Sequence, residues 1–140
     1  MATWTEFCEL AGSFGAKQLN PTLWQFGVPA RTEDHEHEVF ASYEVMQPAF
    51  EFLSLKTALV RVSGVDCEQV LRSLGQLLVG AIGYQPMFDA GGNTIDGMLT
   101  LSTSIPLVGI DLSDPSWLLL YINVLGQAGD GLGKQMAISG

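Results

Sequence analysis

The spacing of hydrophobic and polar residues divides the chain into helical and extended segments. Near the N-terminus, Thr3 and Glu6 have the spacing of a helix capping box, and apolar residues then recur at steps of three and four as far as Gly15. This pattern predicts an amphipathic first helix. It should end near Leu19, because Asn20-Pro21 follows and proline cannot continue a helix.

Extended segments dominate the middle of the chain. Residues 22–28 are rich in aromatic and branched side chains, and residues 38–46 and 53–63 alternate in character with a period of two. These three segments predict an antiparallel meander. Residues 84–89 and 97–105 flank a glycine-rich stretch that is typical of a hairpin connection, which predicts two further strands.

Two more helices are expected. One begins at Asp66, which starts a second capping box, and its apolar stripe continues to residues 80–83. The other follows Ser113-Asp114-Pro115, in which Asp114 is the expected cap. Residues 126–133 contain four glycines, and each glycine costs about 1 kcal/mol relative to alanine inside a helix. We therefore expect the last turns of this helix to be loose or broken and residues 126–140 to be flexible.

The order of the predicted elements is α-β-β-β-α-β-β-α. It indicates an α+β fold in which an antiparallel sheet packs against helices. The chain has 140 residues, of which 47% are hydrophobic and 15% are charged. This composition supports a packed core, and the length fits a single domain over residues 1–140.

The formal net charge of −9 narrows the range of partners. The six lysines and arginines stand singly, without a basic cluster. Neutralising phosphates requires clustered cations, so we expect neither nucleic acid nor an anionic membrane as a partner.

The sequence has no signal-peptide pattern and no apolar run of about 18 residues, which predicts a cytoplasmic protein. Cys8 and Cys67 lack CxxC spacing and are expected on apolar helix faces as free thiols, with a bridge between them as the alternative.

Motifs for catalysis and cofactor binding are absent from the sequence. It contains no GxGxxG, no P-loop and no GxSxG elbow, so we predict no catalytic residues and no cofactor. The most reactive-looking cluster is the acidic segment 33–38, in which His35 and His37 would share a face of an extended chain. We interpret it as a solvated turn and predict no metal. A metal site or a cryptic enzyme at these two histidines is the alternative.

Large apolar side chains are more numerous in the first three strands and the connections between them than one sheet face needs. Either this surplus meets a partner protein, or the first helix covers it. Aromatic and methionine side chains on an adaptable surface suit the recognition of peptide segments. The candidate partner-binding residues are Trp24, Phe26, Phe40, Met46, Phe50 and Phe52.

The element order, the size, the acidic balance and the stretch 97–107, followed by Asp114-Pro115 and an apolar helix, resemble the type III secretion chaperone-like fold and its YbjN-like relatives. The resemblance implies a homodimeric, non-enzymatic chaperone or adaptor that binds an extended segment of a partner, with the second helix at the dimer interface. It makes interface candidates of Leu71, Leu74, Leu78, Tyr84 and Met87. In size the chain also loosely resembles a cyanobacterial carboxysome assembly factor, so the client could be a carboxysome shell protein or a secreted effector.

Three hypotheses follow from the sequence. The first is an assembly chaperone that captures an extended segment of another protein. The second is a structural or regulatory homodimer whose surplus of apolar side chains is consumed by self-association. The third is the metal binder or cryptic enzyme at His35 and His37.

Overall fold

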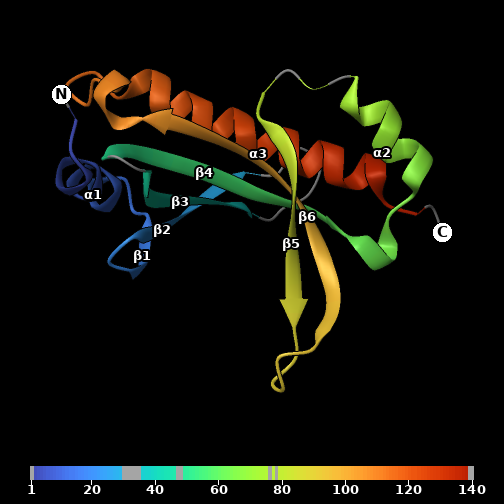
Figure 1. Cartoon of the computed structure of the whole chain (residues 1–140). Helices are drawn as coiled ribbons and strands as arrows, with labels where there is room; N and C mark the ends of the chain where they lie inside the picture. Colours follow the sequence, from blue (N-terminus) through green and yellow to red (C-terminus); the bar gives the residue numbers. More distant parts are fainter. Residues whose placement is uncertain (1, 30–35, 47–48, 76, 78, 139–140) are drawn as a thin grey trace.

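The described part of the chain folds into one antiparallel sheet of six strands and three α-helices (Figure 1). The computed structural model describes residues 2–29, 36–46, 49–75, 77 and 79–138. The predicted α+β class is therefore confirmed. The elements in chain order are α1 (Trp4–Ser13), β1 (Lys17–Asn20), β2 (Leu23–Pro29), β3 (Glu36–Met46), β4 (Phe50–Arg61), the 3₁₀ turn η1 (Val62–Gly64), α2 (Cys67–Leu74), β5 (Ala81–Phe88), β6 (Thr94–Pro106), the 3₁₀ turn η2 (Leu107–Gly109) and α3 (Ser116–Met136).

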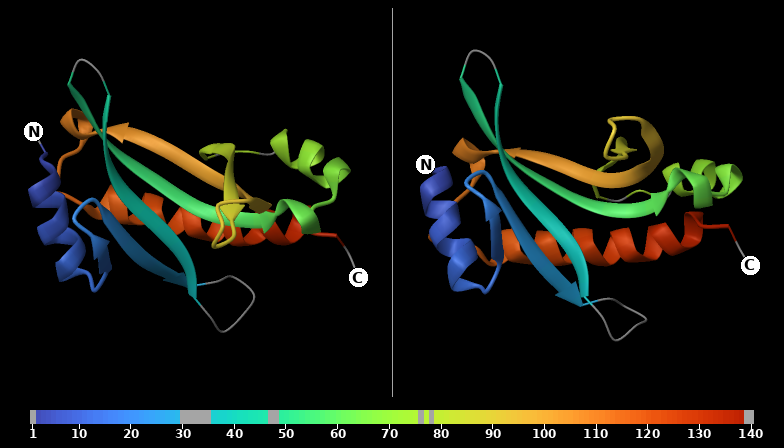
Figure 2. Two further views of the ribbon diagram at one scale, coloured as in Figure 1. Left: turned by 60° about the horizontal axis from the view of Figure 1, so that its bottom comes forward. Right: turned by 90° about the horizontal axis from the view of Figure 1, so that it is seen from below.

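The strands are ordered β1-β2-β3-β4-β6-β5, and every neighbouring pair is antiparallel. Because side chains alternate between the two faces of a strand, the register assigns each residue to a face. The row through Phe26, Val39, Thr57 and Leu101 faces the core. The right-hand view of Figure 2 shows α3 running along this side of the sheet, with α1 at one end and α2 at the other.

The glycine-rich helix α3 packs closely on the sheet. A β-carbon would lie 2.8 Å from Val28 at Gly126, 2.5 Å from Thr57 at Gly129 and 2.2 Å from a backbone oxygen of β4 at Gly133. The predicted loose or broken last turns are wrong, because α3 continues to Met136. Three of the four glycines lie on the buried side of the helix, where their small size allows the close approach that offsets their low helix propensity.

The N-terminal region contains a strand that the sequence pattern did not indicate. The predicted cap is confirmed, since the Glu6 N–H donates to the Thr3 hydroxyl at 3.2 Å. The prediction that the first helix reaches Leu19 is wrong, because α1 ends at Ser13 and β1 follows it. Gly15 has a φ of +76°, which ends the helix and turns the chain back towards β2.

The second helix is also shorter than predicted. The Asp66 carboxylate accepts hydrogen bonds from the Glu68 and Gln69 N–H groups, which confirms this cap. The prediction that the helix continues to residues 80–83 is wrong, because α2 ends at Leu74 and residues 81 and 82 begin β5. Gly80, with a φ of +73°, makes the turn into this strand.

The third helix begins one residue later than predicted. Pro115 is its N-cap, and no side chain there bonds to the helix backbone, so the predicted cap at Asp114 is wrong. The Asp114 carboxylate instead accepts a hydrogen bond from the Ser116 hydroxyl at 2.8 Å. Within the described ranges, no helix combines the length and the apolar character that crossing a bilayer requires.

Both cysteines are free thiols. Cys8 is half-buried, and its sulfur accepts a hydrogen bond from the Trp24 indole N–H at 3.2 Å. Cys67 is exposed at the start of α2, so its predicted place on an apolar helix face is wrong. The exposure follows from its position at the first residue of a helix that packs on α3 through buried Ser73.

Candidate functional site

The face of the sheet opposite α1 and α3, which we call the open face, is the candidate site. The α1 side chains of Trp4 and Phe7 contact Tyr43 and Phe26, which lie on the core face, and α2 packs on α3. The described helices therefore leave the other face uncovered. The strand register places on the open face Leu23 and Gln25 of β2, Phe40, Ser42, Glu44 and Met46 of β3, Phe50, Phe52, Ser54 and Lys56 of β4, Gln85 of β5, and Ser102 and Ser104 of β6.

Four of the six predicted partner-binding residues lie on the open face. Phe40 and Phe52 are half-buried there, and Met46 and Phe50 form a cross-strand pair in which each side chain is 59% exposed.

The Tyr43 hydroxyl donates a hydrogen bond to the Glu51 carboxylate within the same hairpin. This hydrogen bond raises the pKa of Tyr43 above its ordinary value.

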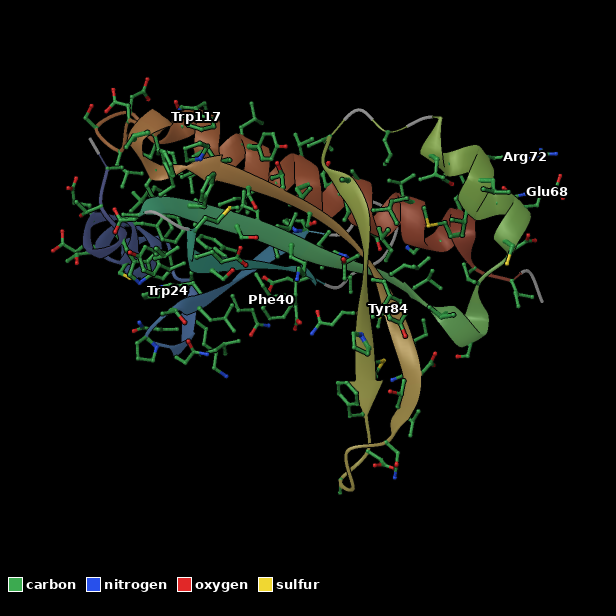
Figure 3. The ribbon with its side chains drawn as sticks, viewed as in Figure 1. Trp24, Phe40, Glu68, Arg72, Tyr84 and Trp117 are labelled. Carbon is green, nitrogen blue, oxygen red and sulfur yellow. The ribbon has the colours of Figure 1, made fainter. Side chains whose placement is uncertain are left out.

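Trp24 and Phe26 belong to the core and not to this surface. They pair with Ala41 and Val39, which are fully buried, and they are only 7% and 8% exposed themselves. The strand alternation that places Leu23 on the open face necessarily turns Trp24 and Phe26 towards α1 and α3. Figure 3 shows Trp24 beside α1 and Phe40 between α1 and the β5–β6 hairpin. For Trp24 and Phe26, therefore, the first helix covers the surplus of apolar side chains.

A groove is hollowed into the open face. Its cavity volume is about 320 Å³, and it is lined by Leu23, Phe40, Ser42, Lys56 and Gln85. In the strand order, β6 separates β5 from β4, yet Gln85 of β5 lines the same groove as Lys56 of β4. The sheet therefore curls until β5 stands over the open face, in agreement with Figure 1, where β5 crosses in front of β4.

Lys56 supplies the positive charge of this groove. It is half-buried, and within the described residues it makes no hydrogen bond and no ion pair. Two other cations of the described chain have carboxylate partners. Arg72 lies 2.8 Å from Glu68, and Lys134 lies 3.5 Å from Asp130.

A second hollow, of about 270 Å³, lies next to the groove across β2 and β3. Its side-chain lining includes Lys17, Gln25, Glu36 and Glu38. Glu36 and Glu38 share the open face with Phe40, because they are separated from it by even numbers of residues along β3. The open face is therefore negative at this end and positive at Lys56.

The predicted dimer-interface residues divide into two groups. Leu71 and Leu74 are exposed on α2, and Tyr84 is exposed on β5, where Met87 is half-buried. Leu78 lies outside the described residues. Tyr84 stands over Gly97 of β6, because a β-carbon at Gly97 would lie 2.1 Å from the tyrosine ring. Figure 3 shows Tyr84 well apart from Glu68 and Arg72 of α2, so the structure does not join the two groups into one patch.

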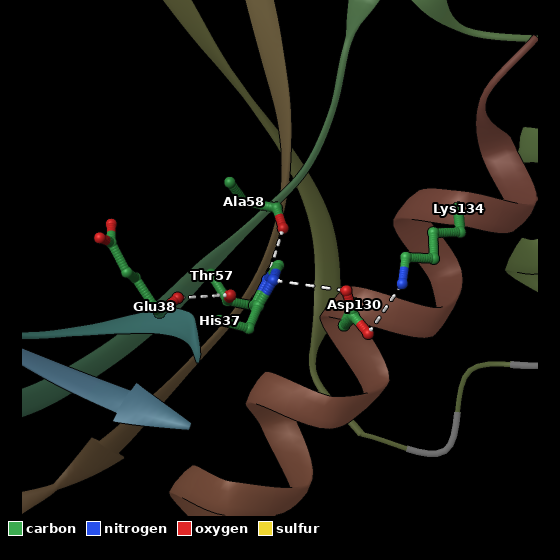
Figure 4. A network of polar contacts seen from close by, with 6 residues as sticks. All are labelled: His37, Glu38, Thr57, Ala58, Asp130 and Lys134. Carbon is green, nitrogen blue, oxygen red and sulfur yellow. Dashed lines mark hydrogen bonds and ion pairs between the residues drawn. The ribbon is translucent and has the colours of Figure 1, made fainter. Parts of the chain in front are cut away.

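His37 points into the contact between the sheet and α3 (Figure 4). Its Nε2 atom lies 3.1 Å from the Ala58 carbonyl oxygen, and its Nδ1 atom lies 3.8 Å from the carboxylate of buried Asp130. His35, the other histidine of the metal alternative, lies outside the described residues. Among the side chains that the structure describes, no group of three or more histidine, cysteine or carboxylate residues could hold a metal ion. The surroundings of His37 are those of an interior polar contact.

Sequence reasoning missed three contributors to these sites. Lys56 and Gln85 stand on strands recognised in the sequence, but only the curl of the sheet brings them into one groove. Asp130 was hidden in the glycine-rich segment, and its spacing of four residues to Lys134 was the available signal.

The open face offers three kinds of interaction to a ligand. Phe40, Phe52 and Leu23 offer apolar contact, Ser42 and Gln85 offer hydrogen-bonding groups, and Lys56 offers one positive charge.

Comparisons with protein-family models, with curated proteins and with solved structures found no match to this chain.

Proposed function

We propose that this protein is a non-enzymatic chaperone or adaptor that captures an extended segment of a partner protein on its open face. One observation carries the proposal. Phe40, Met46, Phe50 and Phe52 come from two adjacent strands and lie on a face that the described helices leave uncovered. Large apolar side chains that remain exposed together on one face mark interaction sites in soluble proteins.

The pairing of the strands supports binding through side chains. Both sides of β3 and β4 are hydrogen-bonded to neighbouring strands, so a segment lying over them gains contacts with side chains and not with the main chain. Ser42, Ser54 and Ser104 form a row of small residues across the sheet. Ser54 in the middle of this row is only 6% exposed, so the contacts of a bound segment would come mainly from the larger side chains on either side of the row.

The resemblance to type III secretion chaperones and YbjN-like proteins is consistent with this role. It implies a secreted effector as the client, and the looser resemblance in size to a cyanobacterial carboxysome assembly factor implies a carboxysome shell protein instead. The free thiols of Cys8 and Cys67 support the cytoplasm as the place of action.

A matched pair of double variants tests the proposal. Random twelve-residue peptides displayed on phage are selected on the wild-type protein, and the enriched peptides are measured by fluorescence anisotropy. Phe40→Gln with Met46→Gln should weaken their binding at least about tenfold. The control is Leu120→Gln with Val124→Gln, which removes two exposed apolar side chains from the outer side of α3 and should leave binding unchanged.

Circular dichroism checks that both double variants keep the fold. Their free energies of unfolding should stay within about 1 kcal/mol of wild type, because the substituted side chains are at least partly exposed. Failure to enrich any peptide, or equal binding by the open-face variant, would refute the proposal.

Self-association is the second candidate function, and the position of β5 favours it. β5 is the last strand of the described sheet, so among the described residues one side of its backbone has no strand partner along Ala81–Phe88. Such an edge can pair with the same strand of a second copy around a two-fold axis. Exposed Tyr84 on β5 would then be covered in a homodimer, whereas Leu71 and Leu74 on α2 belong to a separate exposed group (Figure 3).

A further inference from the structure

We infer that the open-face groove recognises a carboxylate next to a large apolar side chain in the captured segment, and that Lys56 binds this carboxylate. The inference rests on the proposed function, because it names the chemistry of the segment that the open face takes. The occupant to which it commits is an extended peptide with one acidic residue beside a Phe, Leu, Trp or Met.

The shape of the groove supports one large side chain with an adjoining polar group. Leu23 and Phe40 form its apolar part, and Lys56 and Gln85 face it from β4 and from the curled β5 strand. Its volume of about 320 Å³ lies at the lower end of the range of about 300–1,000 Å³ typical of small-ligand pockets. The groove is thus matched to one large side chain of a peptide with its adjoining polar group and not to a folded surface.

The charge of the groove selects an acid. Lys56 is half-buried, and none of the described carboxylates lies within ion-pair distance of it, whereas Arg72 and Lys134 are paired with Glu68 and Asp130. Within the described residues Lys17 also has no such partner, but its side chain is exposed to water. An ammonium group partly removed from water beside apolar side chains interacts more strongly with a carboxylate than a fully solvated one does. A carboxylate supplied by the ligand completes this unfilled interaction.

The rest of the open face limits how acidic the segment can be. Glu36 and Glu38 lie in the adjacent hollow, and Glu44 stands opposite Phe52. The whole chain carries a net charge of −9, which repels a strongly acidic peptide. The segment that fits therefore has a local acid at Lys56 and neutral or basic residues towards Glu36 and Glu38.

The test uses random eight-residue peptides displayed on phage, selected in parallel on the wild type, on Lys56→Met and on the control Arg72→Met, which removes an exposed cation from α2, away from the open face. Lys56→Met keeps most of the length of the side chain and removes its charge. Wild type and the Arg72→Met protein should enrich peptides with Asp or Glu within two residues of a large apolar residue, and Lys56→Met should not.

Synthetic pairs of one enriched peptide quantify the effect. Wild type should bind the peptide carrying Asp about tenfold more tightly than its Asn counterpart at low salt, and the ratio should shrink as salt rises. Lys56→Met should bind the two alike, and Lys56→Glu should prefer a counterpart carrying Lys. The Asp and Asn peptides on wild-type protein decide the question even where a Lys56 variant fails to fold.

The outcomes separate the two proposals. Enriched peptides without an acidic preference, or an acidic preference that persists in Lys56→Met, overturn the role of Lys56 and leave the open face as a peptide-binding surface. Peptides that bind equally to the Phe40→Gln/Met46→Gln variant bind elsewhere, and they overturn both proposals. An absence of any enriched peptide also overturns both.

Discussion

Gly133 of α3 lies directly over the backbone of Leu59 in β4. A β-carbon at position 133 would come within 2.2 Å of the Leu59 carbonyl oxygen and 3.0 Å of its carbonyl carbon. Backbone atoms inside a paired sheet cannot rotate out of the way as a side chain does. The distance between the helix and the sheet is therefore set by the absence of a side chain at this position.

Gly133→Ala should lower the free energy of unfolding by about 1–3 kcal/mol or more, because α3 must move off the sheet. Gly131 is the matched control, since it stands in the same helix with nothing within 4 Å of its β-carbon position. Gly131→Ala should raise stability by about 0.5–1 kcal/mol. Urea denaturation of both variants gives the comparison, and equal effects of the two substitutions would contradict the close packing.

Asp130 is the buried partner of His37. Asp130→Ala should lower the free energy of unfolding by about 1–3 kcal/mol, because it leaves the Nδ1 side of the His37 ring without its acidic neighbour inside the contact between α3 and the sheet. Asp130→Asn keeps an oxygen at this position and should recover part of the loss. Chemical denaturation at pH 7 measures both, and wild-type stability in Asp130→Ala would show that the contact contributes nothing.

Asp96 ties β6 to the η1 turn. Its carboxylate accepts hydrogen bonds from the Ser63 hydroxyl at 2.6 Å and from the Gly97 N–H at 2.8 Å, and these bonds lower its pKa below the ordinary value of 3.8. A carboxyl whose pKa is lower in the folded state stabilises the fold above its unfolded pKa. That contribution disappears as the pH falls through the still lower folded pKa.

Asp96→Asn should therefore reduce stability at pH 7, and the difference from wild type should shrink as the pH falls below about 3.8. Thermal unfolding followed by circular dichroism across this range measures the effect. Glu9→Gln on the exposed side of α1 is the control. A loss in Asp96→Asn that stays constant down to the lowest pH would point to a steric cause.

Self-association through β5 predicts that the molecular mass in solution is that of a dimer. Wild type should be a dimer by light scattering over a micromolar dilution series, and Tyr84→Asp should raise the dissociation constant of the dimer at least about tenfold. Val108→Asp, which changes an exposed apolar residue of η2, should not. A wild type that is monomeric at every concentration would contradict the proposed homodimer.

The central strands could be predicted from the sequence because local alternation and global packing agree there. Residues 38–46 and 53–63 alternate with a period of two, and this alternation places Phe40 and Lys56 side by side on one face. Which of the two faces the helices cover is decided by contacts distant in sequence. Trp24 could therefore not be assigned to the core, where it meets Cys8 and Gly12 of α1.

The ends of all three helices were predicted wrongly, for other reasons. Propensity counts each glycine of residues 126–133 as a cost, whereas the fold uses three of them to seat α3 on the sheet. At Gly15 and Gly80 a positive φ replaces a predicted helical turn, and the residues that follow pair with a neighbouring strand. A glycine that ends a helix can be recognised from the local sequence. The strand with which the following residues pair is distant in sequence, so it cannot be recognised in this way.

The place of Gln85 in the groove has a mechanical consequence. Gln85 belongs to the outermost strand, which is held on one side only, whereas Phe40 and Lys56 belong to strands held on both sides. The β5 wall of the groove can therefore bend, whereas the floor that Phe40 and Lys56 form is held rigidly. Under the proposed function, a single hairpin bending outward would admit residues of different bulk, so the tolerance for varied sequences would be set by the elasticity of β5 and β6 and not by repacking of the core.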